Sequence, residues 1–192
     1  AGWCKANAVK FILDESFVDF SVGFEDNTFV NNRILEMYPT MTVIKSISKS
    51  YGVPGLRLGI MCSSDIAMIS RIKKKVSIWN INSFAEFYLQ IYSKYANDYA
   101  MACHHFIEER KRFYQELQNI NYLRVIPSQA NYFLCEVIEK YTATELVEKL
   151  LKHNILLKDC SKKAGFEGQD YARIAIRNSK DNDCLIKALK SC

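Results

Sequence analysis

The first third of the chain alternates between short apolar runs and polar loops. Residues 9–13, 41–47 and 56–61 are largely apolar and of strand length, which predicts strands buried in a sheet. The stretch 23–32 is rich in Asp, Asn and Gly and predicts a loop. Asp14 follows the first run directly, so we expect a buried strand whose carboxyl end presents an acid.

Helical spacing dominates the middle of the chain. Residues 65–76 carry isoleucines on one helical face, with Ser64 as the expected N-cap. Longer helical patterns follow over 83–95 and 98–120. The second long helix is expected either to brace two domains or simply to pack on a surface.

A compact mixture of strands and helices is expected after residue 121. Thr142 and Glu145 form a capping box ahead of an amphipathic helix, and residues 181–189 predict a last helix. The strands expected here are residues 123–126, 132–137, 155–157 and 171–176. The fold class is therefore α/β: part of a large, mostly parallel domain over 1–98, then the connecting helix and a small C-terminal α/β domain over 99–192.

Composition excludes several classes of protein. No apolar run is long enough for a membrane span, and the net charge is only +5. Residues 73–75 are three lysines without interleaved aromatic residues, which favours a solvated helix end over a nucleic-acid site. Seven cysteines without a C-x-x-C pair, and three histidines without metal spacing, favour a cytoplasmic protein with reduced thiols and no metal.

The segment 46–59 combines the residue types that a covalent phosphate cofactor requires. It places Ser46 and Ser48 at a strand end, then Lys49, then a glycine-bearing loop, then Arg57. Hydroxyl groups and a guanidinium bind phosphate, and a lysine beside that anchor can form a Schiff base with an aldehyde. A surface lysine is the alternative, and the clustering of these residues argues against it.

Two further positions suit the same chemistry. Asp14 could pair with a protonated pyridine nitrogen, although a strand-end or capping aspartate is an alternative. Alternation along residues 171–177 places Arg173 and Arg177 on one face of a strand. Arg173 is expected to bind a substrate carboxylate, and Arg177 either a second anionic group or solvent.

These motifs resemble the aspartate-aminotransferase superfamily, the fold-type-I pyridoxal-phosphate enzymes. The likeness lies in ILDESFVDF at 12–20, SISK at 46–49, PGLRLG at 54–59, WNIN at 79–82, RFY at 112–114, ANY at 130–132 and ARIAIR at 172–177. It is greatest to the branch of threonine-phosphate decarboxylase and histidinol-phosphate aminotransferase, and to the C-terminal half of such enzymes.

The resemblance implies roles for individual residues. Lys49 would hold pyridoxal 5'-phosphate and act as the catalytic base, and Asp14 would face the pyridine nitrogen. Ser46, Ser48 and Arg57 would bind the cofactor phosphate. Phe17 stands where transaminases usually have a tyrosine that bonds the ring oxygen. Substrate-binding residues would be Arg173, Arg177 and Asn131.

Three functions follow as hypotheses. A homodimeric enzyme acting on a phosphorylated amino acid, by decarboxylation or by transamination, ranks first. A non-catalytic assembly module ranks second, because family members are about twice this length and the other half would complete the pocket. We expect this chain alone to be inactive. A nucleic-acid binder rests only on net charge and ranks last.

Overall fold

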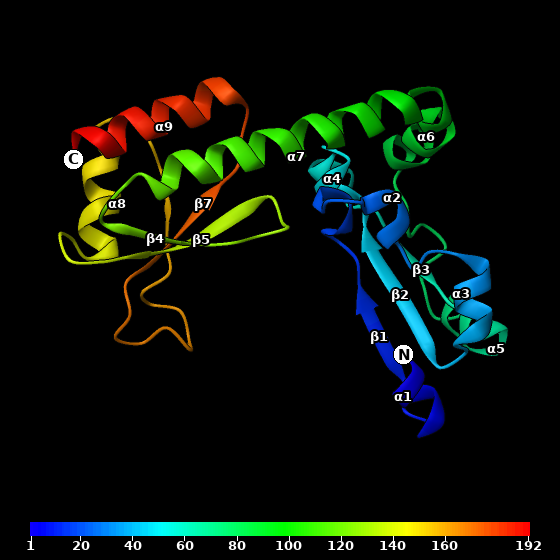
Figure 1. Cartoon of the computed structure of the whole chain (residues 1–192). Helices are drawn as coiled ribbons and strands as arrows, with labels where there is room; N and C mark the ends of the chain where they lie inside the picture. Colours follow the sequence, from blue (N-terminus) through cyan, green and yellow to red (C-terminus); the bar gives the residue numbers. More distant parts are fainter. The chain divides into compact units, whose positions relative to one another are not determined.

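The division between the two parts of the chain falls inside one long helix, α7 (Ala96–Gln118). The computed structural model describes all 192 residues and separates into unit 1, residues 1–103, and unit 2, residues 104–192 (Figure 1). The sequence predicts this division between residues 98 and 99. Each unit has its own sheet and its own buried residues, so each is described by itself.

Unit 1 is built on a three-stranded mixed sheet. Its strands are β1 (Phe11–Asp14), β2 (Met41–Ser46) and β3 (Gly59–Cys62), in the order β1-β2-β3. β1 and β2 are parallel, because the long connection over 15–40 crosses over, whereas the shorter connection over 47–58 returns β3 antiparallel. The α/β class is confirmed, but the sheet is mixed rather than mostly parallel.

Short helices surround this sheet, and two of them contradict the expected loop over 23–32. That stretch contains α2 and the start of α3. Asp65, rather than Ser64, caps α5: its carboxylate accepts from the Met68 amide at 2.8 Å, whereas the Ser64 hydroxyl donates to Leu35 O at 2.7 Å. The helices of unit 1 before α7 are α1 (Gly2–Ala6), η1 (Val18–Phe20), α2 (Phe24–Asn27), α3 (Asn32–Met37), α4 (Ile47–Ser50), η2 (Pro54–Leu56), α5 (Ile66–Lys73), α6 (Ser83–Ile91) and η3 (Tyr92–Tyr95).

Only one face of the β1–β2 pair is buried. Met41 and Val43 are fully buried and pack against Leu35 of α3. On the opposite face, Ile12 is 67% exposed, and Asp14 is also exposed. The expectation that β1 is a buried strand is therefore wrong, since β1 is an edge strand with a single covered face.

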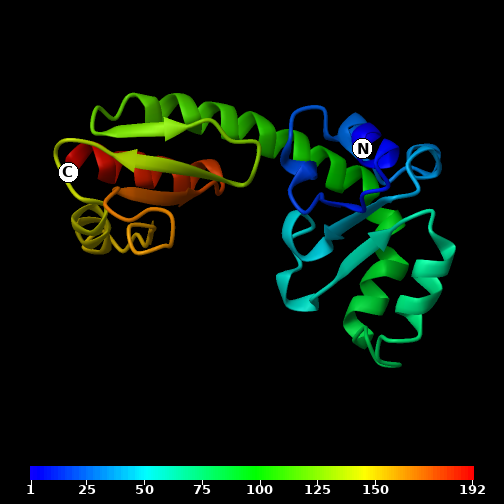
Figure 2. The ribbon, with the colours of Figure 1, turned by 90° about the horizontal axis from the view of Figure 1, so that it is seen from below.

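Unit 2 is an antiparallel sheet covered by helices. Its strand order is β4-β5-β7-β6: β4 (Leu123–Ile126), β5 (Tyr132–Val137), β7 (Tyr171–Ala175) and β6 (Lys158–Asp159). Helix α9 (Ser179–Ser191) runs beside the C-terminal part of α7 along this sheet (Figures 1 and 2). Their apolar side chains, together with those of α8 (Ala143–Leu151), form a single core around Phe113, Phe133 and Ile174.

Two local predictions in unit 2 have opposite outcomes. The capping box is confirmed, because the Thr142 hydroxyl accepts from the Glu145 amide and the Glu145 carboxylate accepts from the Thr142 amide. The strand expected at 155–157 is wrong. Asn154 has a positive φ of 59° and the Ile155 amide bonds Leu150 O, so the chain is still leaving α8 and pairs with β7 only from Lys158.

Adjacent leucines at the end of α8 allow a matched test of the core. Leu150 is fully buried, whereas Leu151 is 49% exposed. We expect Leu150→Ala to lower the free energy of unfolding by about 2 to 5 kcal/mol through lost contacts and a residual cavity. Leu151→Ala should change it by less than about 0.5 kcal/mol. Urea denaturation measures both, and equal losses would contradict this description of the core.

Candidate functional site

Asp14 lies at the carboxyl end of β1 and is held by the residue two positions later. Its Oδ1 accepts from the Ser16 amide at 2.9 Å and from the Ser16 hydroxyl at 2.5 Å. These two hydrogen bonds, and the positive charge of Lys49, hold the pKa of the Asp14 carboxyl below its usual range. Asp14 is therefore an ionised carboxylate near Lys49.

Ser16 also joins the two parallel strands. Its Oγ accepts a hydrogen bond from the Ser46 amide at 3.1 Å. One hydroxyl thus connects the acid that ends β1 with the residue that ends β2. Parallel pairing places Asp14 opposite Ile44, so the carboxyl ends of both strands lie at the same edge of the sheet.

Lys49 lies on α4, the single turn that follows β2. Its side chain is exposed, and its Nζ lies 4.2 Å from the centre of the Phe17 ring. An ammonium group at this distance over an aromatic face is attracted by the ring. The structure therefore brings together three of the predicted residues, Asp14, Phe17 and Lys49.

Ser46, Ser48 and Arg57 line one shallow depression of about 280 Å³. Gly59 is opposite Ser46 in the β2–β3 register, and it also lines the depression. A side chain at Gly59 would begin only 3.3 Å from Lys45 O, so a glycine keeps this strand close to β2. The depression thus presents serine hydroxyls and a guanidinium beside the turn that carries Lys49.

Ser48 and Arg57 differ in their burial and in their contacts with the rest of the protein. Ser48 is buried, and its hydroxyl donates to Leu58 O at 3.3 Å while accepting from the Leu58 amide at 2.9 Å. Arg57 is exposed and has a left-handed backbone with φ of 56°, which is unusual for a residue with a side chain. Strained backbone of this kind concentrates at functional sites. Ser48 fixes the loop, whereas the exposed Arg57 guanidinium makes one long hydrogen bond, to Pro54 O at 3.4 Å.

The predicted substrate residues lie in unit 2. Arg173 and Arg177 are exposed, while Ala172, Ile174 and Ile176 between and beside them are buried, as the alternation predicts. The Arg173 guanidinium lies 5.3 Å from the centre of the Tyr132 ring. Asn131 is joined to this strand through its carbonyl oxygen, which accepts from the Ile176 amide at 3.0 Å. Their roles stay a prediction.

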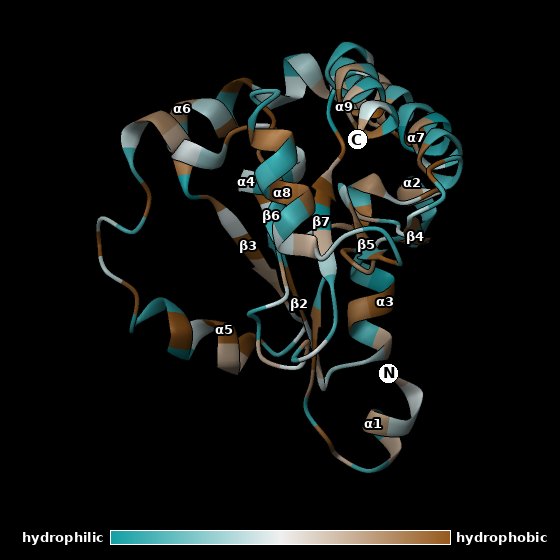
Figure 3. Ribbon diagram, turned by 90° about the vertical axis from the view of Figure 1, so that its left-hand side faces the viewer, coloured by the Kyte–Doolittle hydropathy of each residue, from teal (hydrophilic) through white to brown (hydrophobic).

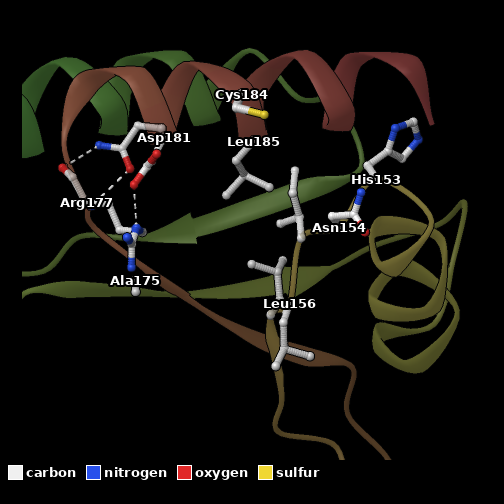
Figure 4. A pocket seen from close by; sticks show the side chains of 11 residues that line it. His153, Asn154, Leu156, Ala175, Arg177, Asp181, Cys184 and Leu185 are labelled. Carbon is white, nitrogen blue, oxygen red and sulfur yellow. Dashed lines mark hydrogen bonds and ion pairs between the residues drawn. The ribbon is translucent and has the colours of Figure 1, made fainter.

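Arg177 borders a cavity of about 480 Å³ between α9 and the end of β7 (Figure 4). Its Nε donates to Asp181 at 2.7 Å, which pairs the residue before the N-cap of α9 with the first turn of that helix. Figure 4 shows Cys184 and Leu185 on α9 along the same cavity. No group of three or more His, Cys, Asp or Glu side chains is arranged to hold a metal ion. None of the helices has the length and apolar character that crossing a membrane requires.

Sequence reasoning missed the residues that support this site. Asp19 forms a buried ion pair with Lys45 and also accepts from the Ser50 hydroxyl. Glu15 is buried and accepts from the Thr28 hydroxyl and the Phe29 amide. One signal was available, because Lys45 interrupts a largely apolar strand and a buried charge requires a partner.

The chain is similar to about half of each of several decarboxylases. The chain is 33% identical over 185 residues to an L-serine phosphate decarboxylase of Campylobacter jejuni, covering 94% of this chain and 47% of that protein. It is 33% identical over 190 residues to the threonine-phosphate decarboxylase of Salmonella typhimurium, covering 98% and 50%. The chain spans about half the length of the curated relatives it matches.

A solved structure agrees with these relatives. The histidinol-phosphate aminotransferase of Clostridium acetobutylicum matches with a TM-score of 0.86 and 29% identity, over 99% of this chain and 56% of that chain. The branch named from the sequence motifs is therefore confirmed by both kinds of relative.

The hydrogen bond from Ser16 to Asp14 generates a titration test. We expect Ser16→Ala to raise the pKa of Asp14, because it removes the largest cause of the lowering, and Lys49→Met to raise it less. Since the folded pKa is depressed, Asp14 stabilises the fold above pH about 3.8, its ordinary value, and this is lost as pH falls through the folded pKa. Ser21→Ala is the control, because that hydroxyl bonds Val18 O. Carboxyl-carbon NMR measures each value, and an unchanged Asp14 pKa in Ser16→Ala would refute this assignment.

The family assignment comes from the chain as a whole. The family model for class I and II aminotransferases matches residues 2–189, which includes every predicted site residue in both units. This chain belongs to the class I and II aminotransferase family.

Proposed function

We propose that the polypeptide containing this chain is a pyridoxal-phosphate-dependent enzyme that acts on a phosphorylated amino acid, most similar to the serine- and threonine-phosphate decarboxylases. The observation that carries this proposal is the grouping around Lys49. Its amine lies over the Phe17 ring, near the ionised Asp14. Lys49 also lies on the turn that follows β2, beside the depression lined by Ser46, Ser48 and Arg57.

The residues of this edge fit the cofactor. A phosphate group suits the depression, since hydroxyl groups and a guanidinium are its preferred partners. The Ser48 hydroxyl already bridges the Leu58 backbone, so Ser46 and Arg57 would carry most of the binding, with Ser48 shaping the loop. Asp14 would face the protonated ring nitrogen, and Ser16 keeps that carboxyl ionised for the purpose.

The proposed roles of the cofactor, Lys49 and Phe17 follow from these positions. When bound, the cofactor supplies an electron sink for a bond broken at the α carbon of the amino acid. Lys49 would hold the cofactor through its amine and, once released, move a proton at that carbon. The Phe17 ring covers one side of the Lys49 amine. It has no hydroxyl group that could accept a hydrogen bond from that amine.

Two reactions remain candidates for this site. Decarboxylation is supported by the two decarboxylase relatives and by Phe17 in place of the usual tyrosine. Transamination of the histidinol-phosphate type is supported by the matching solved structure. Which bond breaks depends on where the substrate carboxylate is held, for which we propose Arg173, with Asn131 beside its sheet and Arg177 for a second anionic group.

We also propose that the whole protein is a cytoplasmic homodimer. Ile78, Trp79 and Phe84 are 90%, 87% and 79% exposed in unit 1. Brown, hydrophobic segments recur along the link between α5 and α6 in Figure 3, and the exposed apolar side chains of Val76, Ile81, Phe87 and Leu89 lie in the same stretch of chain. Exposed apolar side chains gathered in this way favour an interface. Seven free thiols support a reducing compartment.

Reductive trapping tests the cofactor assignment. We expect the full polypeptide, incubated with pyridoxal phosphate and then borohydride, to carry the cofactor mass on Lys49. Lys49→Ala should lose this label, because Lys45, the lysine that lines the depression, is buried and paired with Asp19. Lys94→Ala, a change within η3, should retain it. Mapping by mass spectrometry locates the label, and a label found elsewhere or on no lysine would refute the proposed enzyme and favour a non-catalytic module.

Product analysis separates the two reactions. With O-phospho-L-serine or O-phospho-L-threonine, a decarboxylase releases carbon dioxide without a 2-oxo acid, whereas an aminotransferase requires the 2-oxo acid. We expect release of carbon dioxide. Arg173→Met should raise KM by about tenfold or more by removing the carboxylate's charged partner. Arg124→Met on β4, an arginine paired with Glu136, is the control. An unchanged KM in Arg173→Met would exclude Arg173 from substrate binding.

A further inference from the structure

One carboxylate contacts the chain on both sides of Lys49. Asp19 Oδ1 accepts from Lys45 Nζ at 2.6 Å, and its Oδ2 accepts from the Ser50 hydroxyl at 2.7 Å. Lys45 is on β2, four residues before Lys49, and Ser50 follows Lys49 directly. Because both oxygens of one rigid group are engaged, the end of the strand and the end of the turn are tied to the same point.

The ion pair between Lys45 and Asp19 is buried. The side chains of Lys45 and Asp19 are only 9% and 7% exposed. A buried charge that loses its partner is strongly destabilising, whereas neutral replacement of both partners is often tolerated. A buried pair of this kind is weak evidence for stability, so its contacts with the turn are the more informative feature.

Neighbouring contacts fix the same turn from other directions. Tyr51, the residue after Ser50, stacks on Tyr99 with ring centres 4.2 Å apart and planes inclined by 12°. Burial raises the pKa of both phenols, so the stack stays uncharged at neutral pH. On the other side, Ser48 is tied to the Leu58 backbone. Within α4, Lys49 alone is exposed, while Ile47 and Ser48 are buried and Ser50 is half-buried.

We propose that Asp19 is a positioning residue: through Lys45 and Ser50 it holds the α4 turn so that the Lys49 amine stays over Phe17 and beside Asp14. This rests on the proposed function. Asp19 itself touches neither the amine nor the depression. It acts by restricting the backbone that carries Lys49, so that the amine meets the cofactor without first ordering a mobile turn.

Removing the clamp without leaving a buried charge requires two substitutions. In the full polypeptide, Asp19→Leu together with Lys45→Met replaces the pair by apolar side chains and deprives Ser50 of its acceptor. Ser50→Ala removes only the link to the turn, and Lys45→Arg keeps an ion pair. The matched control is Glu116→Gln together with Lys190→Met, which removes an ion pair of unit 2.

The first measurement is hydrogen exchange without cofactor. The amides of Ile47 and Ser48 both bond Leu58 O, so their exchange reports the order of the turn. We expect about tenfold faster exchange of these amides in the double variant, as when a charge-assisted hydrogen bond is lost, with β5 amides unchanged. Ser50→Ala should show a smaller increase, and Lys45→Arg and the control pair none. Unchanged exchange at Ile47 and Ser48 in the folded double variant would overturn the proposal.

The second measurement is the fraction of Lys49 that borohydride fixes to the cofactor at a limiting cofactor concentration. A clamp that positions the amine predicts about tenfold less label in the double variant, and no loss of label in the single variant Lys45→Arg, which keeps the ion pair with Asp19. Faster exchange with an undiminished label would reduce Asp19 to a packing role and overturn the proposal. If the unsubstituted protein takes no label at Lys49, the proposed function fails instead, and the exchange data still decide whether Asp19 holds the turn.

Discussion

Parallel pairing of β1 with β2 is the constraint on which the candidate site depends. It places the carboxyl ends of the two strands at one edge of the sheet, so that Asp14 and the segment beginning at Ser46 become neighbours although they are far apart in sequence. The connection over 15–40 permits this crossover. The antiparallel return of β3 then brings Gly59 opposite Ser46 and Arg57 to the same depression. Without that register, Asp14, Lys49 and the residues that line the depression would not share an edge.

Contacts between two loops position the residues that the strands bring together. The loop after β1 contributes Ser16, Phe17 and Asp19, and the segment after β2 contributes Ser46, Lys49 and Ser50. Ser16 joins Asp14 to the Ser46 backbone, Phe17 lies under Lys49, and Asp19 bonds Ser50. The ILDESFVDF segment is thus more than a source of one acid. Ser16 and Asp19 bond the residues around Asp14 and Lys49, and Glu15 bonds the loop over 28–29.

Sequence reasoning found residues that line the candidate site and missed the ones that support it from within the protein. Lys49, Ser46 and Arg57 stand within one short motif, and their spacing alone indicates phosphate and aldehyde chemistry. The partner of Lys45 lies 26 residues away, and that of Ser50 lies 31 away, at a separation that only the folded chain defines. Single-residue errors had similar causes. Ser64 and Asp65 are both good caps, and tertiary contact of Ser64 with Leu35 decided between them.

The strand expected at 155–157 failed for a related reason, since its apolar residues complete the exit from α8 before pairing begins. The two units would contribute different groups to the proposed chemistry. Unit 1 contains the groups proposed to hold and activate the cofactor, and most of these suit any pyridoxal-phosphate reaction at an α carbon, with Phe17 favouring decarboxylation. Unit 2 contains Arg173 and Arg177, the groups that would hold the substrate's anionic ends. Because the bond that breaks is set by where the carboxylate is held, we propose that the arginine-bearing strand β7 contributes, together with Phe17, to the choice between decarboxylation and transamination.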